Sequence, residues 1–118
     1  MKRITFNIVR RGWDRIEPDE AEGYQLTPNF ACHKDEWHRP DHPWVLTHIG
    51  SGMACFWHTT RAACLADAEK LETLRTPSGG RFHWETVTVE NSARRLRSLG
   101  HGAVSRCVGR DATVQEVG

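Results

Sequence analysis

The segment from Val45 to Leu74 constrains the fold of this chain more than any other, because two strands and a helix follow one another with only tight connections. Trp44 to Ile49 reads as a strand, Gly50-Ser51-Gly52 as a tight turn, and Met53 to His58 as the returning strand. Both sides of the returning strand carry apolar side chains. We therefore expect it at a central position in the sheet, covered on both faces.

An amphipathic helix follows this hairpin. Thr59 or Thr60 can cap its amino end, because a threonine oxygen accepts a hydrogen bond from an amide of the first turn. Apolar residues then recur every three or four positions, at Cys64, Leu65, Ala68, Leu71 and Leu74. The run Thr76-Pro77-Ser78-Gly79-Gly80 cannot continue a helix. The pattern predicts a helix that packs one stripe of side chains on the sheet.

Shorter patterns flank this segment on both sides. Residues 4–9 alternate with a period of two, and residues 82–89 do so again, which predicts one strand at each place. Asn91 or Ser92 starts a short helix from Ala93 to Leu99, which Gly100 closes. Residues 103–108 are consistent with a last strand, and we expect residues 109–118 to form a flexible tail.

These elements predict an α+β fold. We expect a mostly antiparallel sheet of about four strands, with one main amphipathic helix and a second short helix packed on one face. A length of 118 residues fits one small domain spanning 1–118. No apolar run has the length of a membrane span and the first residues lack the apolar core of a signal peptide, so we expect a cytoplasmic protein that does not engage a membrane.

Residues 10–43 break the pattern. Prolines, glycines and five acids between Asp14 and Glu22 interrupt any periodicity, which predicts a long irregular region. Structureless connections of this length are uncommon inside compact domains. We expect a partly ordered binding loop that includes a short element near Tyr24 to Phe30.

The strongest metal candidates lie in this region, at Cys32, His38 and His42. Zinc requires four such ligands arranged as a tetrahedron, and no second pair with suitable spacing completes the set. Pro40 also works against His38 and His42 sharing a helical face. A zinc-supported structural domain is therefore a third hypothesis, and we expect no cofactor. The four cysteines lie far apart in the sequence and are expected to be free thiols in a reducing compartment.

The sequence offers no recognisable catalytic set. A reactive cysteine needs a base close to it and a lowered pKa, and no spacing selects one cysteine from the four. No phosphate-binding loop is present in the sequence, and the paired acids lie in polar runs. We therefore expect a protein that is not an enzyme.

The leading hypothesis is a protein-binding domain that uses the region around residues 13–44. Tyrosine, tryptophan and arginine are the commonest anchors of protein interfaces, and this region interleaves aromatic residues with acids. The candidate contact residues are Trp13, Asp14, Glu17, Asp19, Glu20, Glu22, Tyr24, Trp37 and Trp44. An equally good alternative is that the rings fold back to cover a sheet edge. An inhibitor or accessory factor encoded by a phage or mobile element, for example an anti-defence protein, fits the size of the chain.

A nucleic-acid-binding domain is the second hypothesis. The carboxyl-terminal part of the chain is locally basic, with candidate phosphate contacts at Arg94, Arg95, Arg97, Arg106 and Arg110. The formal net charge of the whole chain is only +1, so any attraction to a polyanion must come from a local patch. A solvated surface helix accounts for the same arginines, and we favour that interpretation.

Overall fold

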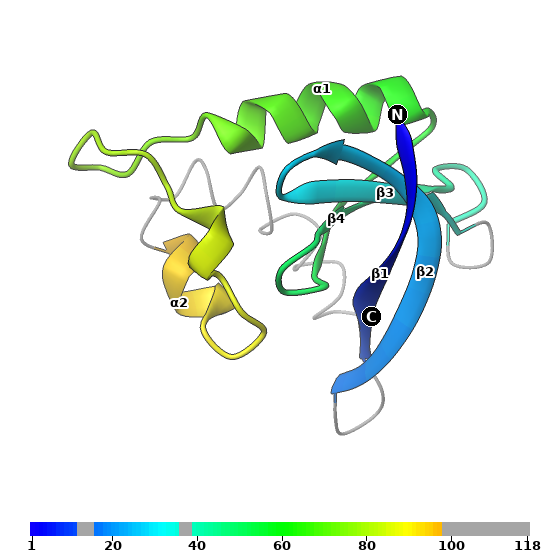
Figure 1. Cartoon of the computed structure of the whole chain (residues 1–118), viewed down its shortest axis with the longest axis horizontal. Helices are drawn as coiled ribbons and strands as arrows, with labels where there is room; N and C mark the ends of the chain where they lie inside the picture. Colours follow the sequence, from blue (N-terminus) through cyan, green and yellow to red (C-terminus); the bar gives the residue numbers. More distant parts are fainter. Residues whose placement is uncertain (12–15, 36–38, 98–118) are drawn as a thin grey trace.

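A computed structural model shows five strands followed by two helices, and it describes residues 1–11, 16–35 and 39–97 (Figure 1). The elements are β1 (Lys2–Arg11), β2 (Ile16–Thr27), β3 (Phe30–Lys34), β4 (Trp44–His48), β5 (Ala54–His58), α1 (Arg61–Glu72), a 3₁₀ turn (Trp84–Thr86) and α2 (Ser92–Arg97). All five strands form one antiparallel sheet in the order β1-β2-β3-β4-β5. The predicted α+β class is confirmed, with five strands in place of about four.

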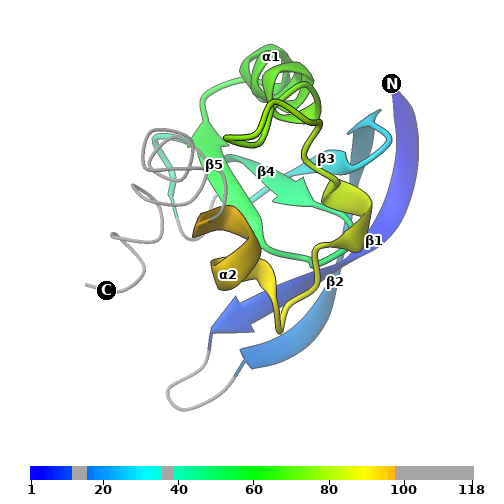
Figure 2. The same ribbon diagram turned by 90° about the vertical axis from the view of Figure 1, so that its left-hand side faces the viewer.

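The strand-turn-strand-helix segment follows the prediction closely. β4 and β5 pair across the glycine-flanked turn, and Thr60 caps α1, its side chain accepting a hydrogen bond from the amide of Ala63 at 3.1 Å. The helix ends at Glu72, earlier than the proline and glycines that were expected to end it. In Figure 2, α1 lies across one side of the sheet, and it packs against β2, β3, β4 and β5.

The expected irregular region from 10 to 43 is the main error of the sequence analysis. β2 and β3 occupy much of it, and β2 pairs with β1 from Lys2 opposite Gln25 to Arg11 opposite Ile16. Two features hide β2 in the sequence. Pro18 lies where β2 pairs with β1 alone, since the register with β3 starts only at Tyr24, so its missing amide need not cost a ladder bond. Gly23 lies where a Cβ would come within 2.0 Å of the carbonyl oxygen of Cys32.

The expected strand over 82–89 is also wrong. The side chains of Phe82, Trp84 and Val87 are buried, but the backbone forms a 3₁₀ turn at Trp84–Thr86 and joins no named strand. Burial alternates only from Phe82 to Glu85; Thr86 is exposed and Val87 is buried, so the period of two in the sequence does not continue in the structure. The expected strand over 103–108, the Gly100 cap and the tail at 109–118 lie outside the described residues.

The returning strand β5 is not central, because it stands last in the sheet order. Its Cys55 and Phe56 are nevertheless buried. The long β1–β2 hairpin is strongly curved (Figure 1), and β1 approaches the β4–β5 turn, where the amide of Val9 donates to the carbonyl of Gly52 at 3.0 Å. Gly52 has a φ of 73°, and a Cβ there would lie 3.1 Å from the Ile8 Cα.

The two faces of the sheet carry separate groups of buried side chains. The larger core includes Phe30, Cys32 and Leu46 from the sheet and Cys64 and Leu71 from α1. A smaller one gathers Phe6, Ile8 and Ala31. Because Ala31 lies between Phe30 and Cys32 in β3, alternation places the smaller group on the face away from α1.

Candidate protein-binding surface

Two aromatic rings and an arginine meet where α1 begins. Tyr24 of β2 and Trp44 of β4 have ring centroids 6.4 Å apart at an interplanar angle of 48°. Arg61, the first residue of α1, places its guanidinium carbon 4.5 Å from the Tyr24 centroid and 5.6 Å from the Trp44 centroid. A guanidinium held over two rings gains cation–π attraction while its N–H groups still reach solvent.

A second arginine approaches Tyr24 from β1. Arg3 lies opposite Tyr24 in the β1–β2 register, and its guanidinium carbon is 5.8 Å from the ring centroid. Arg3 also donates to Glu22 at 2.7 Å, and the two side chains are 63% and 65% exposed. We call Arg3, Glu22, Tyr24, Trp44 and Arg61 the ring–guanidinium cluster. It offers two rings, two cations and one anion on one surface.

Two buried thiols lie beneath this cluster. Cys32 of β3 and Cys64 of α1 are both 0% exposed. A hydrogen bond from the Cys64 thiol lowers the pKa of Cys32, with burial opposing and the Arg61 charge assisting this shift. The same hydrogen bond, burial and the nearby Cys32 and Asp67 raise the pKa of Cys64. The Cys64 sulfur also lies 3.9 Å from the carbonyl oxygen of Trp44.

A half-buried histidine lies next to Trp44. His58 is directly opposite Trp44 in the β4–β5 register, and its Nε2 is 2.8 Å from Oδ2 of Asp67 on α1. This contact ties the last residue of β5 to the middle of the helix. It therefore helps to hold α1 in the position that places Arg61 over the rings.

The structure brings together only part of the predicted contact set. Glu22, Tyr24 and Trp44 belong to the cluster. Asp19 and Glu20 are exposed further along β2, in a strand and not in the binding loop that was expected. The side chain of Glu17 and the whole of Trp13, Asp14 and Trp37 lie outside the described residues.

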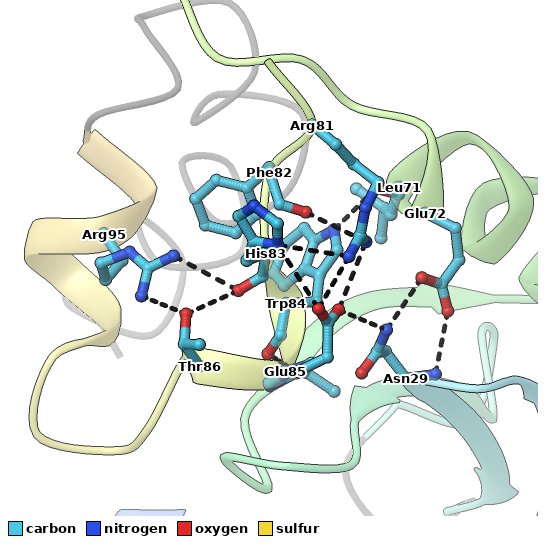
Figure 3. Close-up of polar contacts among 11 residues, drawn as sticks. Asn29, Leu71, Glu72, Arg81, Phe82, His83, Trp84, Glu85, Thr86 and Arg95 are labelled. Carbon is cyan, nitrogen blue, oxygen red and sulfur yellow. Dashed lines mark hydrogen bonds and ion pairs between the residues drawn. The ribbon is translucent and has the colours of Figure 1, made fainter.

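Arg95 of α2, one of the candidate phosphate contacts, makes contacts within the domain. Arg95 donates to the hydroxyl of Thr86 and, at 3.3 Å, to the carbonyl of His83, and it lies 5.1 Å from the Phe82 ring centroid (Figure 3). Arg95 thus holds the 3₁₀ segment in place. Arg94 is exposed. The side chain of Arg97 and both Arg106 and Arg110 are outside the described residues.

A polar network fixes the same segment from the other side (Figure 3). Arg81 donates to both carboxylate oxygens of Glu85, at 2.7 and 3.3 Å, and this hydrogen bonding lowers the pKa of Glu85 to about 2. Asn29 joins Glu85 to Glu72 of α1, at 3.2 and 2.9 Å. These carboxylates are engaged in ion pairs and amide contacts that anchor the segment on α1 and on the turn between β2 and β3.

Cys32 and His42, two of the three predicted zinc ligands, do not converge. The thiol of Cys32 is buried in the core, His42 is exposed in the connection before β4, and His38 lies outside the described residues. The sequence placed the two residues close together, but β3 carries Cys32 onto the inner face. Within residues 1–11, 16–35 and 39–97, no three histidine, cysteine or acidic side chains are placed to share a metal ion.

A buried serine and histidine form a structural pair near the end of β4. Nδ1 of His48 accepts from the Ser51 amide at 3.1 Å and lies 2.8 Å from the Ser51 hydroxyl, while Nε2 lies 2.8 Å from the carbonyl oxygen of Trp84. Burial lowers the pKa of His48. His48 is 1% and Ser51 5% exposed, so this pair connects the hairpin to the 3₁₀ segment inside the core.

Comparison of the chain with protein-family models, with curated proteins and with solved structures gives no match. Among the helices that the structure describes, none is both long and apolar enough to cross a membrane.

The sequence analysis missed Arg3 and Arg61. Arg61 follows the helix cap, and Arg3 lies on a predicted strand, but neither position shows which ring it will meet. That information depends on the register of β1 with β2 and on where α1 lies over the sheet. One weak signal was present in the sequence. Arg61 lies in the first turn of the helix, where a positive charge is unfavourable for the helix dipole, so its position calls for a different interaction to explain it.

Proposed function

We propose that this chain is a non-enzymatic protein-binding domain that contacts its partner through the ring–guanidinium cluster. The observation that carries the proposal is the position of Arg61, stacked over Tyr24 and Trp44. Tyrosine, tryptophan and arginine are the residue types most enriched among interface residues that dominate binding energy. An arginine stacked on rings is already ordered, so less conformational entropy is lost when it binds.

The chemistry of the cluster suits binding better than turnover. A guanidinium remains protonated at neutral pH and cannot act as a general base. Its planar fork instead donates two parallel hydrogen bonds to a carboxylate. Among the described residues, Arg61 has no carboxylate partner of its own, whereas Arg3 is paired with Glu22. Arg61 is therefore the cation best placed to pair with an acidic side chain of a partner.

The mixed charge of the surface favours a protein partner over a nucleic acid. Glu22 sits within the cluster, and the exposed Glu20 precedes it on β2. Carboxylates repel phosphates, and affinity for nucleic acid depends on phosphate neutralisation. An interface with complementary charges of both signs makes use of both the arginines and the glutamates. A domain of this kind would act by occlusion or by scaffolding, as an inhibitor or an accessory factor of the sort that phages and mobile elements encode.

The experiment is a capture from a lysate of the source cells with the tagged full chain and three baits: wild type, Arg61→Ser and Arg75→Ser. Arg75 is also an exposed arginine but lies in the connection after α1, so it is the matched control. Each capture is made with and without nuclease treatment. We expect a specific protein to be retained by wild type and by Arg75→Ser, with about 30-fold weaker binding to Arg61→Ser.

Thermal melting of the three baits separates loss of contact from loss of fold. If Arg61→Ser has the same melting temperature as wild type but no longer retains the partner, the result supports contact through the ring–guanidinium cluster. Equal retention by all three folded baits would contradict the proposal.

A single-stranded nucleic acid is the second candidate, since rings beside guanidinium groups also form stacking platforms for bases. Retained material that disappears on nuclease treatment, and a binding constant that falls steeply with salt, would favour this candidate. A protein that survives nuclease, with a shallow salt dependence, would favour the first.

A further inference from the structure

The register of the sheet and the position of α1 bring two cysteines that are distant in sequence together. Cys32 lies opposite Tyr24 on β2 and opposite Leu46 on β4. The first turn of α1 covers these positions, because Arg61 lies over the Tyr24 ring and the Cys64 sulfur contacts the Trp44 carbonyl, two residues before Leu46. The α1 face of the sheet thus brings Cys64 and Cys32 into the same buried core cluster.

The two thiols interact asymmetrically. A hydrogen bond between them and the positive charge of Arg61 lower the pKa of Cys32, whereas the pKa of Cys64 is raised. Together they favour the thiolate at Cys32, although burial opposes it, and they leave the proton on Cys64. A dithiol with one favoured thiolate and one neighbouring protonated thiol has the arrangement of an attacking and a resolving cysteine.

We infer that Cys32 and Cys64 form a dithiol that closes into an internal disulfide between β3 and α1 by exchange with a small-molecule disulfide. In the first step the Cys32 thiolate attacks one sulfur of the small disulfide, forming a mixed disulfide and releasing one thiolate, which takes up a proton. In the second step Cys64 loses its proton, attacks the Cys32 sulfur and expels the second small thiolate. The two cysteines are oxidised and one small disulfide is reduced to two thiols.

The position of the pair sets how the exchange occurs. Both sulfurs are fully buried, so the small disulfide reaches Cys32 when the first turn of α1 lifts from the sheet. That turn carries Arg61, and lifting it also takes the guanidinium off the two rings. The third described cysteine, Cys55, is buried on β5 with its sulfur 3.9 Å from the Met53 carbonyl, and it has no part in this contact.

The test uses the full wild-type chain, equilibrated natively in glutathione buffers of increasing oxidised fraction, quenched with acid and digested with trypsin without reduction. Trypsin places the four cysteines on four different peptides, covering residues 16–34, 35–61, 62–70 and 107–110. We expect the linked pair 16–34 with 62–70 to appear and to become the dominant cysteine product, with an intact mass lower by two hydrogens. This result does not depend on the proposed function, because no binding partner is present.

Two controls sharpen the assignment. Cys64→Ser should leave Cys32 as a glutathione adduct without any internal link, because the resolving thiol is gone. In the unfolded wild-type chain in urea, the pairing should spread over all four cysteines. The inference is overturned if native wild type links other peptides preferentially, or if it stays reduced or carries only glutathione adducts at every buffer ratio. Since the decisive measurement uses wild type, a failure of the variant to fold would not affect it.

Discussion

Protonation of His48 is expected to make the stability of this domain depend on pH. Its Nε2 faces the Trp84 carbonyl, which only accepts, so Nε2 carries the hydrogen and Nδ1 accepts from the Ser51 amide. A second proton at Nδ1 would point at that amide hydrogen, so the hydrogen bond from Ser51 would be lost. Burial lowers the pKa of His48 from 6.5, whereas the Trp84 carbonyl and the charges of Glu72 and Glu85 act in the opposite direction.

The sign follows from proton binding in the two states. Because the pKa of His48 is lower in the folded protein, the unfolded chain binds the proton more readily below pH 6.5. The free energy of unfolding is therefore fully maintained above that pH and falls as the pH drops from 6.5 toward the folded pKa. Its slope is at most about 1.4 kcal/mol per pH unit for this one group, as long as native His48 stays neutral.

The assay is urea unfolding of wild type, His48→Gln and His42→Gln between pH 5 and 8. Glutamine does not titrate, so His48→Gln should be less stable than wild type at pH 7.5, and this difference should shrink as the pH falls. His42 is exposed, and replacing it should leave the wild-type slope unchanged. Curves for wild type and His48→Gln that stay parallel across this range would refute the reasoning.

Three further substitutions, one of them with a matched control, test the fold by urea unfolding. Gly23→Ala should cost about 3 kcal/mol or more, since its Cβ would lie 2.0 Å from the Cys32 carbonyl oxygen, whereas Gly80→Ala, with its nearest contact at 3.7 Å, should stay within about 0.5 kcal/mol. Equal effects would contradict the register. Thr60→Ala should cost about 1 kcal/mol by removing the α1 cap, and no change would mean that the cap is dispensable. Trp84→Phe should cost about 2–3 kcal/mol, because it leaves a gap and a helix carbonyl without its 2.6 Å partner; a neutral result would show that the core repacks.

Local signals predicted the hairpin and helix well because neighbouring residues determine them. The turn glycines, the threonine cap and the spacing of Cys64, Ala68 and Leu71 are features of adjacent turns and strands. The same logic failed for β5, because its place in the sheet is set by the order of all five strands. Apolar residues on both sides of the strand suggested a central position, but Cys55 and Phe56 are both buried in the larger core although β5 is the last strand of the sheet.

β2 could not be recognised from its own residues. Its described acids, Asp19, Glu20 and Glu22, sit at exposed positions, and Pro18 and Gly23 are tolerated for reasons that involve β1 and β3. Propensity measures how well a residue suits an average strand, whereas these two residues suit one particular register. The predicted 82–89 strand failed for a different reason, since its apolar residues are buried in a segment that forms a 3₁₀ turn and joins no named strand.

The candidate surface shows the same division between local and distant information. Tyr24 and Trp44 could be selected by residue type alone, because tyrosine and tryptophan are among the commonest anchors of protein interfaces. That they contact each other, and that Arg61 covers both, follows from pairing β2 with β3 and β3 with β4 and from the placement of α1. The buried pair of Cys32 and Cys64 depends on that same placement, and their separation in sequence gave no sign of it.

The proposed binding surface and the inferred dithiol should therefore be thermodynamically linked. A partner that engages Arg61 in its stacked position binds the closed form of the first α1 turn, while oxidation proceeds from the open form. Binding to one state lowers the population of the other by the factor 1 + [L]/Kd, so a partner at 100 times its Kd should slow disulfide formation about 100-fold. Timed alkylation of Cys32 and Cys64 in oxidised glutathione, with and without the captured partner, measures this factor. With Arg61→Ser at the same partner concentration, the protection should largely disappear. Oxidation at the same rate with and without saturating partner would show that the partner does not hold the first turn of α1 closed.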